Sequence, residues 1–196
     1  MARSVPEADH PYPEAGVFPA TLTTDRLVLR PPRLVDAQAN FDRYASDPQA
    51  TRFLSWKTHA SVRDTREFLA RIVSPEEKNR DQHWAICVAG ETLPSGMITT
   101  FGEGQIVALG YVLERRWWGQ GVMTEALLAV TKCVWKDDRT WRLQALAHVE
   151  NVGSHRVLEK GGLRLEGTLR RRFVMPQRGS EPQDCRIYAQ VRDDLM

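Results

Sequence analysis

The sequence predicts a mixed α+β fold, and two observations lead to it. Apolar residues alternate with polar ones in some segments and recur at helical spacing in others. The two kinds of segment are interleaved, in the order strand, two helices, three strands, helix, strand, helix, two strands. That order excludes an all-helical bundle and a β-sandwich. We expect one domain over residues 21–196, preceded by an arm at 1–20 that holds four of the 11 prolines.

The first half of the chain predicts a strand, two helices and a meander. Residues 24–30 (TDRLVLR) alternate as a strand does, until a Pro-Pro pair stops it. A helix at 34–44 ends before an Asp-Pro pair, because a residue before proline resists the helical region. A second helix follows Ser61, which forms a capping arrangement with an acidic residue three positions on. Gly-containing turns then separate three strands of an antiparallel meander, at 83–90, 96–101 and 105–113.

The second half alternates between helix and strand. A clean apolar stripe predicts a helix at 122–135, and strict alternation predicts a strand at 141–149. The next helix, at 151–160, ends at a Gly-Gly pair, a common helix stop. Two last strands have apolar cores at 163–165 and 187–191.

Charge and composition exclude several classes of protein. Lys and Arg number 27 and Asp and Glu 25, so the net charge of +2 gives no bulk attraction to nucleic acid or membrane. The chain has no apolar run of the ~18–20 residues that a membrane span requires, and its N-terminus lacks the apolar core of a signal peptide. The 3 cysteines are odd in number, which argues against a disulfide framework. We expect a cytoplasmic protein.

The segment from Gly110 to Ala126 (GYVLERRWWGQGVMTEA) carries the most chemical information. A predicted strand runs into an R-x-x-G-x-G turn formed by Arg116, Gly119 and Gly121, and a helix begins at once. Glycines at this point let the backbone approach an anion closely. The unpaired N–H groups of the first helical turn then point at that anion. The segment therefore predicts a phosphate-binding turn.

Two other phosphate motifs do not fit this segment. A P-loop requires G-x-x-x-x-G-K-[ST], which the sequence does not contain. A dinucleotide-binding fold requires G-x-G-x-x-G, and the third glycine position is Thr124.

The same segment resembles the acyl-CoA pyrophosphate motif of the GNAT superfamily of N-acetyltransferases. The downstream run from Asn151 to Leu163 (N-x-x-S-x-R-V-L-E-K-x-G-L) adds to the match, and the opening T-x-R-L-x-L-R at 24–30 completes it. Together, over residues 21–192, they are similar to the branch that acetylates the N-termini of ribosomal proteins. The resemblance implies a GNAT-like acyl-CoA N-acyltransferase fold. Such a fold is a largely antiparallel sheet of about seven strands, with a central splay between the strands at 106–113 and 141–149 and helices on both faces.

The resemblance also implies an activity and its partners. The chain would transfer an acetyl group from acetyl-CoA to a primary amine by direct attack in a ternary complex, without a metal. The acceptor would be a protein N-terminal α-amine or a small-molecule amine. A homodimer is compatible with this, and no membrane or direct nucleic-acid partner is expected.

Site residues follow from the matched motifs. The strand would pair through its backbone with the pantetheine arm, at Tyr111, Val112 and Leu113. The pyrophosphate would be cradled by Arg116, Trp118, Gly119, Gln120, Gly121, Val122, Met123 and Thr124. Asn151 would bind the pantetheine or its surroundings, and Ser154 would lie near the thioester sulfur.

Acetyl transfer needs a neutral amine, a polarised carbonyl and a protonated thiolate. Many GNAT enzymes supply the thiolate's proton from a tyrosine seven residues after this asparagine, but that position is Leu158 here. Ser154 is the hydroxyl that remains, and the backbone N–H of Leu113, at an expected bulge, is the natural carbonyl polariser. Glu103 is the first candidate for the base, and Glu150 is the second.

Several other side chains have both a functional and a structural interpretation. Trp56 and His59 lie where the family forms its acceptor site, and either line that pocket or pack a loop. The paired residues Trp117 and Trp118 either clamp the cofactor or pack the helix start. The run Arg170–Arg172 either grips an anion or RNA, or forms a solvated strand face. The competing functions are therefore an acyl-CoA-binding sensor without turnover and an RNA- or ribosome-binding protein.

Overall fold

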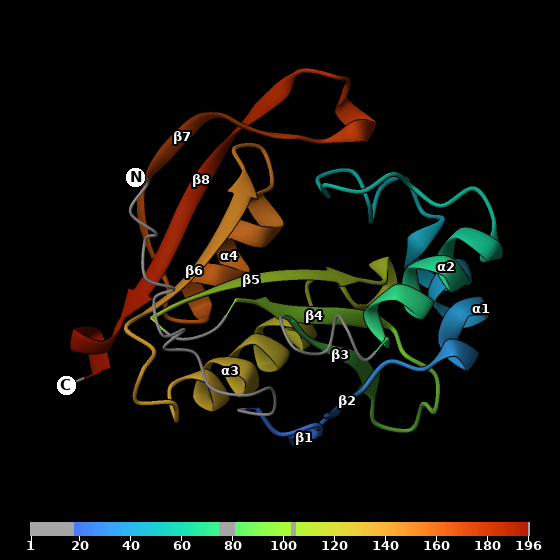
Figure 1. The fold of residues 1–196 in the computed structure, drawn as a ribbon, viewed down its shortest axis with the longest axis horizontal. Helices are drawn as coiled ribbons and strands as arrows, with labels where there is room; N and C mark the ends of the chain where they lie inside the picture. The colour runs from blue at the N-terminus through green and yellow to red at the C-terminus, as the bar shows by residue number, and fades with distance from the viewer. Residues whose placement is uncertain (1–17, 75–80, 103–104, 196) are drawn as a thin grey trace, which may run out of the picture.

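The computed structural model describes residues 18–74, 81–102 and 105–195, which form one eight-stranded sheet with helices on both faces (Figure 1). The strand order is β1-β2-β3-β4-β5-β6-β8-β7. Every neighbouring pair is antiparallel except β5 and β6, which are parallel. The strands are β1 (Leu22–Thr23), β2 (Leu27–Arg30), β3 (Asp81–Val88), β4 (Gly96–Phe101), β5 (Ile106–Leu113), β6 (Arg142–His148), β7 (Arg164–Val174) and β8 (Pro182–Val191). The helices are α1 (Ala37–Asn40), α2 (Val62–Ile72), α3 (Val122–Val134) and α4 (Val152–Lys160).

Two hydrophobic clusters hold the helices to opposite faces of the sheet. The larger one joins α3 and α4 to one face, through residues such as Leu127 and Leu158, both fully buried. The smaller one joins α1 and α2 to the other face, where Leu69 meets Met97 of β4 and Val112 of β5. The α+β class, the antiparallel meander β3-β4-β5 and the placement of helices on both faces are thus confirmed.

The predicted strand at 24–30 is present only as β2 (27–30), and an additional short strand, β1 (22–23), precedes it, which gives eight strands where about seven were expected. Thr24 donates its backbone N–H to the carbonyl of Leu27 (2.9 Å), so β1 and β2 form a tight hairpin. The turn is fixed from outside, because Glu125 of α3 accepts hydrogen bonds from the Thr24 hydroxyl (2.5 Å) and the Arg26 guanidinium (2.7 Å). This contact between distant segments leaves no local trace in the sequence.

The predicted helix at 34–44 is irregular. A 3₁₀ turn (Leu34–Asp36) leads into α1, and a π-helical turn (Phe41–Ala45) follows. The backbone N–H and the hydroxyl of Ser46 both bond the carbonyl of Phe41 (3.1 and 2.7 Å), which closes the wider turn. The second helix begins at the predicted capping box of Ser61 and Asp64.

The last two strands are much longer than their apolar cores suggested. β7 and β8 form a hairpin that extends beyond the sheet, so most β7 side chains are exposed and apolar alternation fades. The run Arg170–Arg172 lies on this exposed strand, which agrees with its interpretation as a solvated strand face. Residues 1–17 of the predicted arm lie outside the described residues. Its end is docked, because Phe18 packs against Trp84 and the carbonyl of Pro19 accepts the Trp84 indole N–H (3.2 Å).

The central splay is present between β5 and β6. The two strands pair only from Ile106–Arg142 to Leu109–Ala145, and both continue beyond that point. Helix α3 starts just after β5 ends and α4 just after β6 ends, so both helix N-termini lie at the open end of the splay (Figure 1).

Candidate functional site: a cavity through the splayed sheet

The open edge of β5 presents backbone groups to the splay. A strand sends the N–H and C=O of alternate residues to opposite edges. Glu114 donates its N–H to Ser95 beside β4 (2.8 Å), so the neighbouring Leu113 faces the splay, and so does Tyr111. Val112 faces β4 instead, which departs from its predicted place in the pantetheine contact. The register of β4 and β5 is also unbroken through Leu113, so the expected bulge is not present there.

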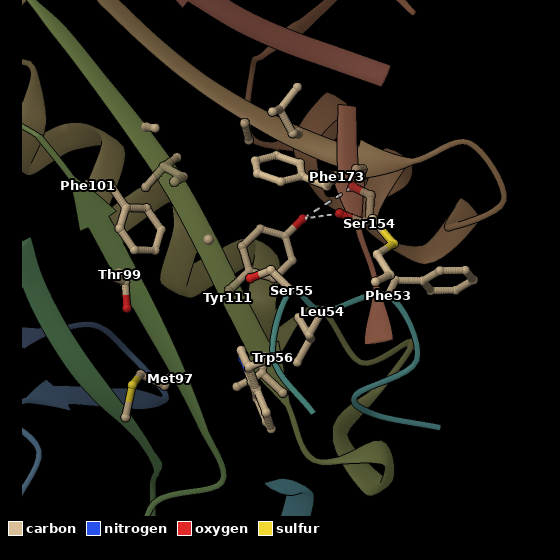
Figure 2. A pocket seen from close by; sticks show the side chains of 18 of the residues that line it. Phe53, Leu54, Ser55, Trp56, Met97, Thr99, Phe101, Tyr111, Ser154 and Phe173 are labelled. Carbon is tan, nitrogen blue, oxygen red and sulfur yellow. Dashed lines mark hydrogen bonds between the residues drawn. The ribbon is translucent and has the colours of Figure 1, made fainter. Parts of the chain in front are cut away.

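A cavity of about 400 Å³ lies at the splay and is lined from both faces of the sheet. One part of its wall consists of Tyr111 on β5 and the α4 residues Asn151 and Ser154. The other part consists of side chains from α1, α2, the 45–61 loop, β3, β4 and the β7–β8 hairpin. In Figure 2 the β4 side chains Met97, Thr99 and Phe101 lie opposite the loop side chains Leu54 and Trp56, with Tyr111 nearer to Ser154. The cavity therefore connects the two faces through the gap between β5 and β6.

Two hydroxyl groups meet at this connection. The Tyr111 and Ser154 hydroxyls are 2.7 Å apart (Figure 2), and the Asn151 side chain accepts the Ser154 backbone N–H (3.2 Å) as the N-cap of α4. Burial raises the pKa of Tyr111, against the opposing effect of the Ser154 hydrogen bond, so the phenol stays protonated. The structure thus brings Asn151 and Ser154 together as predicted. It adds the Tyr111 side chain, for which only a backbone role was expected.

The phosphate-binding turn has the predicted backbone form. Gly119 and Gly121 both adopt positive φ (73° and 77°), which a residue with a side chain rarely does. A Cβ on Gly119 would meet nothing within 4 Å, so the space beside it is open. Gly121 is the N-cap of α3, and the first N–H groups of that helix belong to the buried residues Val122 and Met123. An anion would meet backbone donors and a helix N-terminus here.

The Arg116 side chain does not point into the turn as a free cation. Its guanidinium lies 2.6 Å from Glu91 and 2.7 Å from Glu114, and stacks over Trp117. Two carboxylates already neutralise it, so we assign Arg116 a backbone part in the turn. Trp118, half exposed, donates its indole N–H to the carbonyl of Leu113 (2.9 Å) and so fixes the end of the open edge.

The two candidate bases do not lie in the described wall of the cavity. Glu103 lies outside the described residues. Glu150 is held at the rim in ion pairs with Arg178 (3.0 Å) and Arg52 (3.7 Å), and it does not line the cavity.

Trp56 and His59 both line the cavity. Their rings contact each other at 4.9 Å, and Trp56 stacks near Phe68 of α2 (6.4 Å). The His59 ring shares a 2.7 Å hydrogen bond with the Thr65 hydroxyl. Burial lowers the pKa of His59, so its imidazole is neutral at pH 7.

His148 and His155 serve the fold at the end of β6. The Arg186 guanidinium donates to Nδ1 of His155 (3.0 Å), so Nε2–H of that ring donates to the His148 carbonyl (2.9 Å). The His148 ring stacks on Phe53 (4.9 Å). The described residues contain no group of three His, Cys, Asp or Glu side chains that could hold a metal. All 3 cysteines are unpaired and buried.

Sequence reasoning missed most of the acceptor half of the cavity. Phe53, Phe101, Phe173, Met175 and the His83–Thr99 pair (2.9 Å) come from the 45–61 loop, the meander and the C-terminal hairpin. The one sequence feature that these residues share is that most are aromatic and lie in segments where apolar and polar residues alternate only weakly.

None of the helices in the described part of the chain has the length and apolarity that crossing a membrane requires.

Comparisons with known proteins point to one family. Residues 26–164 match the family model described as "Acetyltransferase (GNAT) domain". The Probable N-acetyltransferase YjcK of Bacillus subtilis is 27% identical over 152 residues, 74% of this chain and 84% of that protein. The Uncharacterized N-acetyltransferase YoaA of the same organism is 26% identical over 182 residues, 90% and 98% of the two chains.

Solved structures share the fold. The RimJ protein of Mycobacterium smegmatis, in complex with CoA-disulfide, superimposes with a TM-score of 0.78 at 22% identity, covering 91% of this chain and 90% of that one. RimL, described as a ribosomal L7/L12 alpha-N-protein acetyltransferase in complex with coenzyme A, has a TM-score of 0.76 at 18% identity, covering 89% and 99%. With the family match over most of its length, the chain belongs to the GNAT acetyltransferase family and is an N-acetyltransferase.

Proposed function

We propose that the protein transfers an acetyl group from acetyl-CoA to a primary amine, with both substrates bound at once. The observation that carries this proposal is the cavity through the splay, which is lined on one side by the open strand edge at Tyr111 and on the other by the aromatic residues of the 45–61 loop and the C-terminal hairpin. The glycine turn before α3 lies beyond the end of that strand edge. A cavity reached from two faces lets an amine meet a thioester without an acyl-enzyme intermediate. Acetyl-CoA would supply the activated acyl group, and the protein would orient the two substrates and transfer the protons.

The backbone of β5 and the turn before α3 would hold the donor substrate. Tyr111 offers its N–H and C=O groups and Leu113 its N–H along the open edge, as a sheet does to an added strand, while the Leu113 carbonyl accepts the Trp118 indole N–H. Gly119, Gly121 and the first turn of α3 offer N–H groups to the pyrophosphate. The Leu113 N–H then lies at the edge where a thioester carbonyl would need a hydrogen-bond donor.

The hydroxyls of Ser154 and Tyr111 would protonate the departing sulfur. A serine hydroxyl alone is a weak acid, but the 2.7 Å contact lets Ser154 donate to sulfur while it accepts from Tyr111. The tyrosine that many relatives carry on α4 is replaced by Leu158, whose side chain is fully buried in the core. The hydroxyl supplied by β5 would therefore do in this protein what that tyrosine does in those relatives.

Ligand binding and thiol release test the proposed function in sequence. Acetyl-CoA at ~100 times its Kd should add about 2.7 kcal/mol to the free energy of unfolding, seen as a rise in Tm. Thiol release over a panel of N-terminal peptides, amino acid amides, arylalkylamines and polyamines should then reveal an acceptor. The proposal fails if millimolar acetyl-CoA leaves Tm unchanged, or if acetyl-CoA binds and no primary amine is acetylated.

A further inference from the structure

The acceptor part of the cavity has no formal charge in its described wall. The described lining residues include no Asp, Glu, Lys or Arg. Charged side chains lie behind this wall. Arg71 acts on His83 and stacks on Phe68 (5.6 Å), Asp64 acts on His59, and the buried Asp36, near Tyr44, is paired with Arg30 (2.7 Å). Glu150 is paired with Arg178 and Arg52. A second ammonium group on an acceptor would therefore find no unpaired carboxylate in the described wall.

The titratable groups among the described lining residues are neutral at pH 7. They are Tyr44 before the 45–61 loop, His59 in it, His83 on β3, Tyr111 on β5 and Cys185 on β8. Burial raises the pKa of both tyrosines and of the cysteine, and lowers the pKa of His83 to about 4. His83 also shares a hydrogen bond with Thr99, so its imidazole stays neutral while it is bound in place.

The walls of this part of the cavity are mainly aromatic. Trp56, Phe68, Phe53, Phe101 and Phe173 line it from α2, β4, the 45–61 loop and the C-terminal hairpin. In Figure 2 Met97 lies on the β4 side with Phe101, and Trp56 lies on the loop side. Gly110, paired with Thr99 in the sheet, makes room for the Phe101 ring, because a Cβ on Gly110 would lie 2.9 Å from that ring. At the α1 end, the Asn40 side chain is 1% exposed, and its Oδ1 has no hydrogen-bond partner among the described residues.

We propose that this cavity selects a primary amine in its uncharged form, carried on an apolar and aromatic body, because the described part of its wall carries no charged side chain. This inference rests on the proposed function. An alkylammonium ion entering the cavity loses its hydration without gaining a counterion, so the free amine binds in preference. A hydrogen-bond donor at the far end of the aromatic body would satisfy Asn40.

The chemical step then balances without a protein base. The ammonium leaves its extra proton in solvent before it enters. The amine nitrogen forms a bond to the carbonyl carbon and the carbon–sulfur bond breaks. Nitrogen gives up one proton to water, and sulfur takes one from the Ser154–Tyr111 pair, which water refills.

The pH profile of the unmodified enzyme with two aromatic acceptors tests this selection. Phenylalanine amide carries an α-amine that titrates near ~7.7–8, and 2-phenylethylamine carries an alkylamine that titrates near ~10. If only the free amine binds, kcat/KM rises about tenfold per pH unit up to each acceptor's own pKa. The two profiles then break about 2 pH units apart. One common break, set by a group of the protein, overturns the inference.

A charge introduced at the wall gives a second test. Ser55 lines the cavity and is exposed, so Ser55→Asp adds a carboxylate with little risk to folding, and Ser55→Asn has the same shape without the charge. In the unmodified enzyme we expect kcat/KM for 2-phenylethylamine to exceed that for 1,4-diaminobutane by at least about 100-fold. Ser55→Asp should narrow that ratio about tenfold relative to Ser55→Asn.

These outcomes are separable from a failure of the proposed function. Binding of acetyl-CoA and acetylation of some amine support the function whatever the selectivity. A diamine or a peptide with an acidic first residue that exceeds 2-phenylethylamine in kcat/KM overturns this inference and leaves the function standing. The inference is also overturned if the ratio of kcat/KM for 2-phenylethylamine to kcat/KM for 1,4-diaminobutane is the same in Ser55→Asp and Ser55→Asn.

Discussion

Tyr111 and Ser154 come from segments far apart in the chain, and their hydroxyls meet because β5 diverges from β6. Tyr111 extends from the open edge strand toward the N-terminal turn of α4, where the Asn151 cap fixes the Ser154 backbone. In the proposed relay Tyr111 is the donor in this contact, and Ser154 would then donate more strongly than an isolated serine, since a hydroxyl that accepts one hydrogen bond donates more strongly.

Substitution of the two hydroxyls tests whether they act as a unit. Ser154→Ala should lower kcat about 30-fold and Tyr111→Phe about tenfold, because each breaks the path of the proton to sulfur. The double variant should be little worse than Ser154→Ala alone, since groups in one relay are not additive. Single-turnover kinetics and acetyl-CoA titration provide the measurements.

Acetyl-CoA affinity is the control for both hydroxyl substitutions. It should stay within about threefold of the unmodified protein, since neither hydroxyl lies at the pyrophosphate turn. Equal losses in affinity and in turnover would reject the proton relay, and so would fully additive effects on kcat.

At the scale of single elements, the start of α3 concentrates the donor site in a few residues. Gly121 serves as N-cap with φ 77°, and its missing side chain keeps the helix N-terminus accessible. A Cβ there would approach Arg26 Nη2 at 3.5 Å, an ordinary contact, so any substitution acts through the backbone and the anion rather than through packing.

Gly121→Ala should weaken acetyl-CoA binding at least tenfold and lower the free energy of unfolding by about 1 kcal/mol, because alanine resists positive φ. Gly90→Ala is the matched control, since Gly90 has φ 84° and nothing within 4 Å of its would-be Cβ. It should show a similar loss of stability and unchanged affinity. Calorimetric titration and urea unfolding distinguish the two, and an equal drop in affinity would refute the anion-binding turn.

The elements that could be placed well from the sequence are those bounded by local turn or helix-stop residues. β4 was placed at its observed bounds, Gly96–Phe101, between glycine-containing turns, and α4 ends at its glycine pair. The hairpin β1–β2 and the extended β7–β8 hairpin were misplaced, because tertiary contacts stabilise them. For the same reason the glycine turn before α3 could be placed from one contiguous motif. The cavity wall could not, since Trp56, Met97 and Phe173 lie together only after folding.

At the scale of the whole molecule, the C-terminal hairpin closes the acceptor cavity. Met175 and Phe173 line it, and the Gln177 amide donates to the carbonyls of Thr51 (2.6 Å) and Trp56 (2.8 Å). These two bonds join the hairpin to the 45–61 loop across the mouth of the splay (Figure 1). The position of Trp56 in the cavity therefore depends on a residue late in the chain.

Gln177→Ala should raise KM for the acceptor about five- to tenfold and leave the acetyl-CoA Kd within about twofold. The change removes the hydrogen-bond donor of two backbone carbonyls, which weakens the contact between the hairpin and the 45–61 loop by about 1–2 kcal/mol. Only the proposed acceptor side of the cavity should become more mobile. Gln38→Ala removes an exposed amide that bonds Asp42 on the far side of α1, and it controls for loss of a glutamine. Steady-state kinetics at saturating acetyl-CoA measure the effect, which a matching rise in the acetyl-CoA Kd would contradict.

The brief parallel contact of β5 and β6, four residue pairs long, divides the sheet into two hydrogen-bonded slabs, β1–β5 and β6–β8. A substrate that pairs with the open edge of β5 while its pyrophosphate binds at the start of α3 would add hydrogen bonds at the boundary between β5 and β6. The boundary would then be more rigid. Hydrogen exchange of the β5 and β6 amides beyond Leu109 and Ala145 would then slow together on binding. The donor substrate would thus add to the folding cooperativity of the protein that consumes it.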